Sequence, residues 1–268
     1  MTLRAAFALL PTPEDEWEGR HSLGPCPEGA VTLSDLAAGG AALERLVALK
    51  QAQADGGDKM LGCAYLIGDL AWEVGNILSA LWLAGWRLAG ADPSAIAVTT
   101  RAVTWEHEGE TGTSHVIDLT FDPAGLTGGG AGPQDLARVM EGLHRDVIAA
   151  MARLTGLGAA AQWRLVGDGL TGALVQRGQA MGQIEQALAL GRAITADRGT
   201  RLHARQTEFV EVRHPKRPEI AEWFRLRGGC CRYYTAEGGE YCTTCVHRDR
   251  DDQIARLTDY LAETHAAG

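Results

Sequence analysis

Residues Leu61–Leu88 read LGCAYLIGDLAWEVGNILSALWLAGWRL, and this stretch decides the fold class more than any other. Apolar side chains surround much of its circumference, which predicts a long and mostly buried helix that is closed by Asp92-Pro93. Asp69, Glu73, Asn76 and Arg87 interrupt it, and its longest clean apolar run, Ile77–Trp86, is too short to cross a bilayer. We therefore predict the core helix of a soluble protein without a transmembrane segment, and leave peripheral membrane association open.

The flanking sequence predicts more helices and one hairpin. Residues 1–30 are irregular, with Pro11 and Pro13 near the start, and Thr32-Leu33-Ser34-Asp35 opens a helix that runs to about Gln53. Further helices are predicted over Gln134–Leu154, Ala159–Arg177, Gln183–Ala196 and Asp251–Thr264, strands over Ile96–Trp105, His115–Phe121 and Thr207–Val212, and a glycine-rich loop over Leu126–Gly132. The fold class is α+β, a helix-rich domain at residues 1–225 with a small antiparallel β element, followed by a cysteine-rich segment at residues 226–268.

The charge of the chain and the sequence at its start indicate which partners and which compartment to expect. The formal net charge of −9 argues against a nucleic-acid partner. Residues 198–250 nevertheless carry eleven Lys and Arg against seven Asp and Glu, a locally positive region that could attract an acidic protein or an anionic ligand. The start of the chain makes a poor signal peptide, because prolines and acids follow its short apolar run, so we expect a cytoplasmic protein.

Four of the six cysteines lie within sixteen residues, in the spacing C-C-x10-C-x2-C. Clustered thiols in a reducing compartment are more typical of a metal centre than of disulfides. The usual zinc signature has two C-x2-4-C pairs, whereas here two cysteines are adjacent, which suits a cluster with separate coordination points. From spacing alone, an iron–sulfur cluster is favoured, and structural zinc or a thiol–disulfide pair stay open.

The block Gly229-Cys230-Cys231-Arg232-Tyr233-Tyr234, with Cys242-Thr243-Thr244-Cys245, resembles the C-terminal signature of the FhuF-type ferric-siderophore reductases. The resemblance implies a [2Fe-2S] cluster held by Cys230, Cys231, Cys242 and Cys245. It also implies an oxidoreductase that passes one electron to siderophore-bound Fe(III), with hydroxamate siderophores expected, and releases Fe(II) in iron acquisition. The electron donor would be a ferredoxin-like protein or a flavin reductase. Upstream of the cysteines the resemblance is diffuse and carries no substrate residue and no catalytic side chain.

Five cationic or titratable residues lie close to the cysteines in sequence: Arg225, Arg227, Arg232, His247 and Arg248. As neighbours of an anionic cluster they would raise its reduction potential, and otherwise they are solvated side chains.

The alternative to a reductase is a non-enzymatic iron–sulfur or zinc-stabilised binding or sensor protein. A transcriptional iron sensor would need a DNA-reading helix with a basic face, and the sequence shows none.

Other patterns have structural explanations. Gly167-Asp168-Gly169-Leu170-Thr171-Gly172 matches G-x-G-x-x-G but lacks the preceding strand and the later acid of a dinucleotide site, so we predict helix packing through small residues and no tight NAD(P) or flavin site. We expect Trp72, Trp82 and Trp86 to pack in the core. His107 with Glu106, Glu108 and Glu110 is expected to form a solvated turn. The isolated cysteines, Cys26 and Cys63, are expected to be ordinary thiols.

Overall fold

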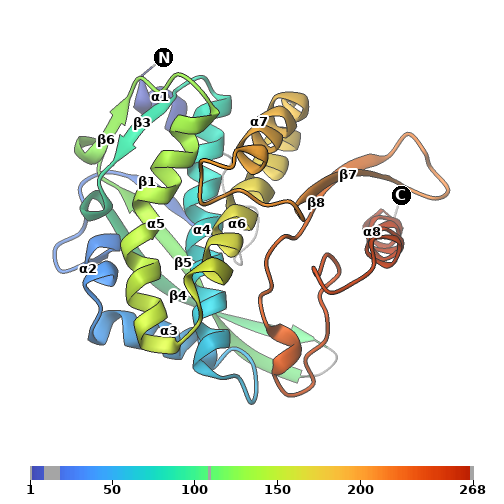
Figure 1. Cartoon of the computed structure of the whole chain (residues 1–268), viewed down its shortest axis with the longest axis horizontal. Coiled ribbons are helices and arrows are strands. Elements are labelled where there is room, and N and C mark those ends of the chain that lie inside the picture. Colours follow the sequence, from blue (N-terminus) through green and yellow to red (C-terminus); the bar gives the residue numbers. More distant parts are fainter. Residues whose placement is uncertain (1, 9–18, 108–109, 266–268) are drawn as a thin grey trace.

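A computed structural model describes residues 2–8, 19–107 and 110–265 (Figure 1). The predicted proline-containing stretch at residues 9–18, and residues 108–109 of the predicted turn, lie outside this part. In chain order the elements are α1 (Leu3–Phe7), β1 (His21–Leu23), β2 (Val31–Thr32), α2 (Leu33–Ala38), α3 (Ala41–Gln51), α4 (Lys59–Leu83), β3 (Leu88–Ala91), β4 (Ile96–His107), β5 (Glu110–Phe121), β6 (Leu126–Gly128), α5 (Pro133–Thr155), α6 (Ala159–Ala180), α7 (Ile184–Ala196), β7 (Glu208–Arg213), β8 (Ala221–Leu226) and α8 (Arg250–Thr264), with single 3-10 turns at Pro93–Ala95, Pro123–Gly125 and Tyr233–Thr235.

Helix α4 is the centre of the fold, and it packs against α3, α5 and α6. By length and composition it could cross a membrane, but 83% of its apolar window is buried inside the protein. Its polar side chains are paired with other elements: Glu73 lies 2.8 Å from His21 Nε2, Asn76 accepts a 3.1 Å hydrogen bond from Arg177 Nε, and Asp69 pairs with Lys50. The prediction of a buried core helix is confirmed, and its polar interruptions are contact points.

Glycines allow α4 and α6 to approach closely. A Cβ on Gly169 would lie 2.7 Å from the Ala71 carbonyl carbon, and one on Gly172 would lie 2.9 Å from the Trp72 ring. The predicted helix packing at residues 167–172 is therefore confirmed, and the G-x-G-x-x-G spacing reflects an interhelical contact.

The hairpin of β4 and β5 belongs to a four-stranded sheet in the order β1-β5-β4-β2. Its strands are longer than predicted, because the pairing extends as far as His107 with Glu110. Strand β1 pairs in parallel with β5, so a segment expected to be irregular is partly ordered by a distant partner. The fold class is confirmed as helix-rich α+β with small, mainly antiparallel sheets.

Two predicted helices are shorter because glycines in the left-handed region end them. Gly39 and Gly40 have φ of 82° and 80° and separate α2 from α3, where one helix was predicted. Gly85, with φ of 86°, follows the end of α4, so Leu88 begins β3. Strand β3 pairs with β6, which forms within the predicted glycine-rich loop.

The C-terminal part has its own small core. Strands β7 and β8 form a hairpin, and apolar residues from both strands and from α8 form one cluster: Val210, Val212 and Leu226 from the strands, Leu257 and Leu261 from the helix. Strand β8 was not predicted, because Pro215 and Pro218 suggested an irregular segment, and both prolines lie in the turn before it. The predicted domain boundary after residue 225 falls at the end of this strand.

Candidate metal centre

The cysteine segment, residues 227–249, runs from the end of β8 to α8 (Figure 1). Two of its contacts with the helical domain lie near the start of α4. The Glu237 backbone N–H donates to the Asp55 carbonyl at 2.8 Å, and the Arg232 guanidinium donates to the Asp58 carboxylate at 3.2 Å. At its other end, Gln253 of α8 donates to the Cys245 carbonyl at 2.6 Å. Contacts with the helical domain and with α8 therefore both hold the cysteine segment in place.

The backbone makes an unusual turn directly after the adjacent cysteines, Cys230 and Cys231. Arg232 has φ of 65° and is the one residue other than glycine with positive φ in the described ranges. This conformation costs a non-glycine residue about 1–2 kcal/mol. The turn places the Arg232 N–H 3.4 Å from Cys230 Sγ, a backbone donor to a candidate ligand sulfur.

Cys242 and Cys245 lie on a tight turn, in which the Cys245 N–H donates to the Cys242 carbonyl at 3.0 Å. Arg248 supports this turn by donating to the Cys242 carbonyl at 3.0 Å while it pairs with Asp252. Cys245 is 3% exposed, and the other three cysteines of the segment are half-buried.

The fold brings Cys231 and Cys242 together from the two halves of the motif. A hydrogen bond from the Cys231 thiol, aided by the Arg227 charge and opposed by burial, lowers the pKa of Cys242 to about 7. The same hydrogen bond, together with burial, raises the pKa of Cys231. Arg227 Nη1 also lies 3.8 Å from Cys242 Sγ, so a cation and a donor face this sulfur.

The residues present fit a two-metal cluster. None of the four cysteines is in a disulfide, and two of their sulfurs already receive N–H groups. In the ranges that the structure describes, no three His, Cys, Asp or Glu side chains gather around one point that could hold a metal ion. A structural zinc ion takes four Cys or His ligands around one point, whereas a two-iron cluster divides its four cysteines between two metals. The contact of Cys231 with Cys242 brings one cysteine from each half of the motif together, as a shared centre requires.

Residues 227–247 match the family model described as the FhuF 2Fe-2S C-terminal domain. The cysteine segment is a FhuF-type [2Fe-2S] domain. The match covers all four cysteines of the motif and assigns a [2Fe-2S] cluster as cofactor. No curated protein and no solved structure matches the chain.

Arginines around the FhuF-type domain form ion pairs. Arg225 Nη1 and Arg227 Nε lie 3.4 Å and 3.6 Å from Asp168 of α6, and all three side chains are largely buried. The interpretation of these arginines as solvated is therefore wrong for this pair. His247 instead packs its ring against Tyr234 and Tyr241 at the surface. Two of the eleven cations of residues 198–250 are thus used inside the fold.

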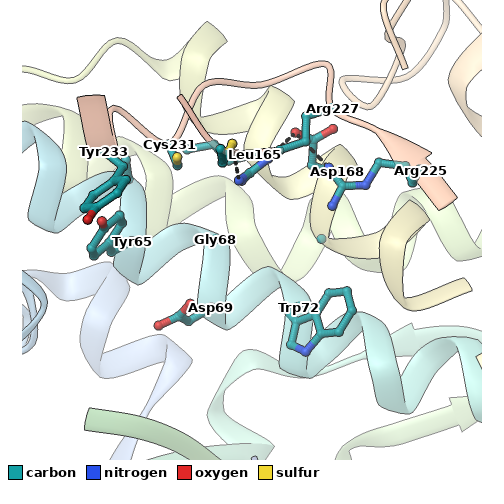
Figure 2. A pocket seen from close by; sticks show the side chains of 13 residues that line it. Tyr65, Gly68, Asp69, Trp72, Leu165, Asp168, Arg225, Arg227, Cys231 and Tyr233 are labelled. Atoms are coloured by element: carbon teal, nitrogen blue, oxygen red, sulfur yellow. Dashed lines mark hydrogen bonds and ion pairs between the residues drawn. The ribbon is translucent and has the colours of Figure 1, made fainter. Parts of the chain in front are cut away.

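A cavity of about 400 Å³ opens between the helical domain and the FhuF-type domain (Figure 2). Its walls come from α4, α6, β8 and the cysteine segment: Ala64, Tyr65, Gly68, Asp69 and Trp72; Leu165, Asp168 and Gly169; Arg225, Arg227, Cys231, Tyr233 and Cys242. A second cavity of about 440 Å³ shares Asp69 and Trp72 with the first and extends to Lys50 and His115. Two of the cysteines thus face a space that can hold a small molecule.

Sequence reasoning missed Asp168 and Tyr65 as site residues. One signal for Asp168 was available, because a carboxylate inside a Gly- and Leu-rich helix requires a buried partner. Of the tryptophans, Trp72 lines the cavity, while Trp82 and Trp86 belong to the apolar core, as predicted. Cys63 is fully buried in α4, Cys26 lies near Ser94, and the side chains of His107, Glu108 and Glu110 lie outside the described part.

Proposed function

We propose that the protein is a cytoplasmic ferric-siderophore reductase that passes one electron at a time to chelated Fe(III) and releases Fe(II) for iron acquisition. One observation carries this proposal: the cavity of about 400 Å³ is bordered by Cys231 and Cys242 of the FhuF-type domain. This volume falls in the range of small-molecule sites, about 300–1,000 Å³.

The chemistry demands little of the side chains. When bound, the [2Fe-2S] cluster supplies a one-electron donor. Hydroxamate oxygens are hard donors that hold Fe(II) less tightly than Fe(III), so reduction itself loosens the chelate, and no nucleophile or general base is required. The protein has to place the chelate close to the cysteines and shield the transfer from water.

The cavity walls supply that placement. Tyr65 and Trp72 of α4 present aromatic surface to an organic chelate, and burial, with the nearby Cys231 and Tyr233, raises the pKa of Tyr65, so its phenol stays protonated. Arg225 and Arg227 place N–H donors on the opposite side. A chelate larger than the first cavity would extend past Asp69 and Trp72 into the second.

Electrons would reach the cluster from a ferredoxin-like protein or a flavin reductase. The surface next to the cysteines carries Tyr233, Tyr234 and Tyr241, which are each about two-fifths exposed. Aromatic side chains are enriched at protein interfaces, so we propose this face for the donor.

The proposed function is tested by mixing dithionite-reduced protein anaerobically with a panel of ferric siderophores. Reoxidation of the cluster is followed by absorbance and Fe(II) by a ferrous trap. Hydroxamate chelates should reoxidise the cluster with one Fe(II) released for each electron. No reaction with any siderophore, while ferricyanide reoxidises the cluster, would contradict the proposal and favour a sensor or binding protein.

A cavity variant separates binding from general redox competence. A Cβ on Gly68 meets nothing within 4 Å, so Gly68→Leu should fill the cavity without disturbing α4, and we expect a more than tenfold slower reaction with the chelate. The ferricyanide reaction should stay unchanged. Gly142→Leu on α5, at an equally open but distant site, is the matched control and should react as the wild type does.

A further inference from the structure

Asp168 is a buried carboxylate between two glycines of α6, and its side chain is 2% exposed. An ionised carboxylate is costly to bury unless hydrogen bonds and opposite charges compensate it. Its surroundings therefore show what it does in the folded protein.

Both carboxylate oxygens bind the backbone just before the cysteines. The Gly228 N–H donates to Oδ1 and the Gly229 N–H to Oδ2, each at 2.9 Å. A Cβ on Gly229 would lie 3.0 Å from the Arg164 carbonyl carbon, so this turn rests directly on the backbone of α6. Asp168 thus fixes the chain at the point from which Cys230 and Cys231 follow.

The same carboxylate also acts on the other half of the motif. Arg227 Nε lies 3.6 Å from Asp168, and Arg227 Nη1 lies 3.8 Å from Cys242 Sγ (Figure 2). Arg225 Nη1 is 3.4 Å from Asp168 on the other side. One anion therefore balances two buried cations, and one of these cations contacts a ligand sulfur.

We propose that Asp168 is a positioning residue for the cluster: it holds the Gly228–Gly229 turn and Arg227 in place and, as the fixed counter-charge of Arg225 and Arg227, keeps the reduction potential low. This inference goes beyond the proposed function, because it holds whatever substrate the cluster reduces. The direction of the effect on the reduction potential follows from the negative charge of Asp168. Reduction adds an electron to an already anionic centre, so the removal of a nearby negative charge favours the reduced form.

The first test is the reduction potential of Asp168→Asn, measured by a redox titration of the cluster-loaded protein. The variant removes the charge and keeps the shape, so the equilibrium constant for reduction should rise about tenfold, an upward shift of about 59 mV for one electron. Asp58→Asn is the matched control: its carboxylate pairs with Arg232 at 3.2 Å but is about half exposed, so its effect is screened. A wild-type potential in Asp168→Asn would overturn the proposal.

The second test does not need the cluster. In the apo-protein, hydrogen exchange of the Gly228 and Gly229 amides should be slow in the wild type, because each N–H is bonded to its own carboxylate oxygen. Asn retains one acceptor, so in Asp168→Asn one of the two amides should exchange at least tenfold faster while α4 amides stay protected. If Asp168→Asn cannot be loaded with cluster, this measurement decides, and unchanged exchange at both glycines overturns the proposal.

Discussion

At the scale of single residues, the six cysteines fall into two groups with different surroundings. Cys230, Cys231, Cys242 and Cys245 lie on one segment, where N–H groups face the sulfurs of Cys230 and Cys242, while Cys63 is enclosed by the core and Cys26 is far away in sequence. Burial raises the pKa of the Cys63 thiol to about 11, so this thiol stays protonated at neutral pH. The environment thus distinguishes the candidate ligand sulfurs from the buried Cys63 thiol.

This difference predicts the behaviour of serine variants. The wild type should hold two irons and two sulfides per chain, with an S = 1/2 signal after one-electron reduction. Cys242→Ser should lose most of the iron and the signal, because it removes one of the four ligands that we assign to the cluster. Iron and sulfide analysis with EPR measures this. Cys26→Ser and Cys63→Ser are the controls and should retain both, and one zinc without sulfide in anaerobically purified protein would contradict the assignment.

His144 predicts a pH dependence of stability. It is fully buried in α5, Nδ1 lies 2.8 Å from the Met140 carbonyl, and burial lowers its pKa to about 4. Because the unfolded chain binds the proton more readily, the contribution of neutral His144 is fully present above pH 6.5 and is lost as the pH falls towards 4, a change of about 3 kcal/mol. Urea unfolding at several pH values measures the free energy of unfolding of both proteins. On acidification, that of His144→Leu should rise relative to that of the wild type by about this amount. A constant difference between the two proteins would rule out this role.

At the scale of elements, the contact of α4 with α6 depends on glycine. Alanine favours helix over glycine by about 1 kcal/mol, but a Cβ at Gly169 would strike the Ala71 backbone at 2.7 Å. Overpacking costs about 1–3 kcal/mol, so after the gain in helix propensity Gly169→Ala should lower the free energy of unfolding by up to about 2 kcal/mol. Gly142→Ala, in an open position of α5, should instead raise it by about 0.5–1 kcal/mol. Denaturant unfolding compares the pair, and equal effects would mean that the helices can separate at no cost.

At the scale of the whole molecule, two cores of unequal size are accompanied by a segment with little apolar burial. The large core lies around α4, and the small one joins β7, β8 and α8. The segment connects β8 with α8, and its described residues 228–249 bury two apolar side chains, Ala236 and Cys245. The cluster should therefore be the main source of stability for this segment.

Removal of the cluster should loosen the cysteine segment before the rest of the chain. In the apo-protein, trypsin should cut after Arg232 and Arg248 at least tenfold faster than in the cluster-loaded form, because local opening no longer breaks metal–sulfur bonds. Mass spectrometry of the fragments locates the cuts. Cleavage inside α4 or α6 should stay slow. Equal cleavage rates with and without cluster would show that protein contacts alone order the segment.

The sequence by itself determined the elements whose signals are local. The buried helix α4, the start of α2 at Thr32–Asp35 and the helix α5 depend on local patterns, and each was predicted near its observed position. The cysteine spacing, through its resemblance to the FhuF-type reductases, predicted the [2Fe-2S] cofactor that the match of residues 227–247 supports, because the motif lies in one short contiguous segment. The four cysteines as its ligands stay a prediction.

Only the tertiary structure decided which distant residues meet. Strand β1 exists because β5 lies beside it, and β3 pairs with β6 although neither has a strong strand pattern. The cavity requires α4, α6 and the cysteine segment together. Asp168 was part of an apparent nucleotide motif, and it lies beside Arg225, Arg227 and the Gly228–Gly229 turn because the chain folds back over sixty residues. Such contacts depend on close packing and charge compensation between segments, which no local pattern encodes.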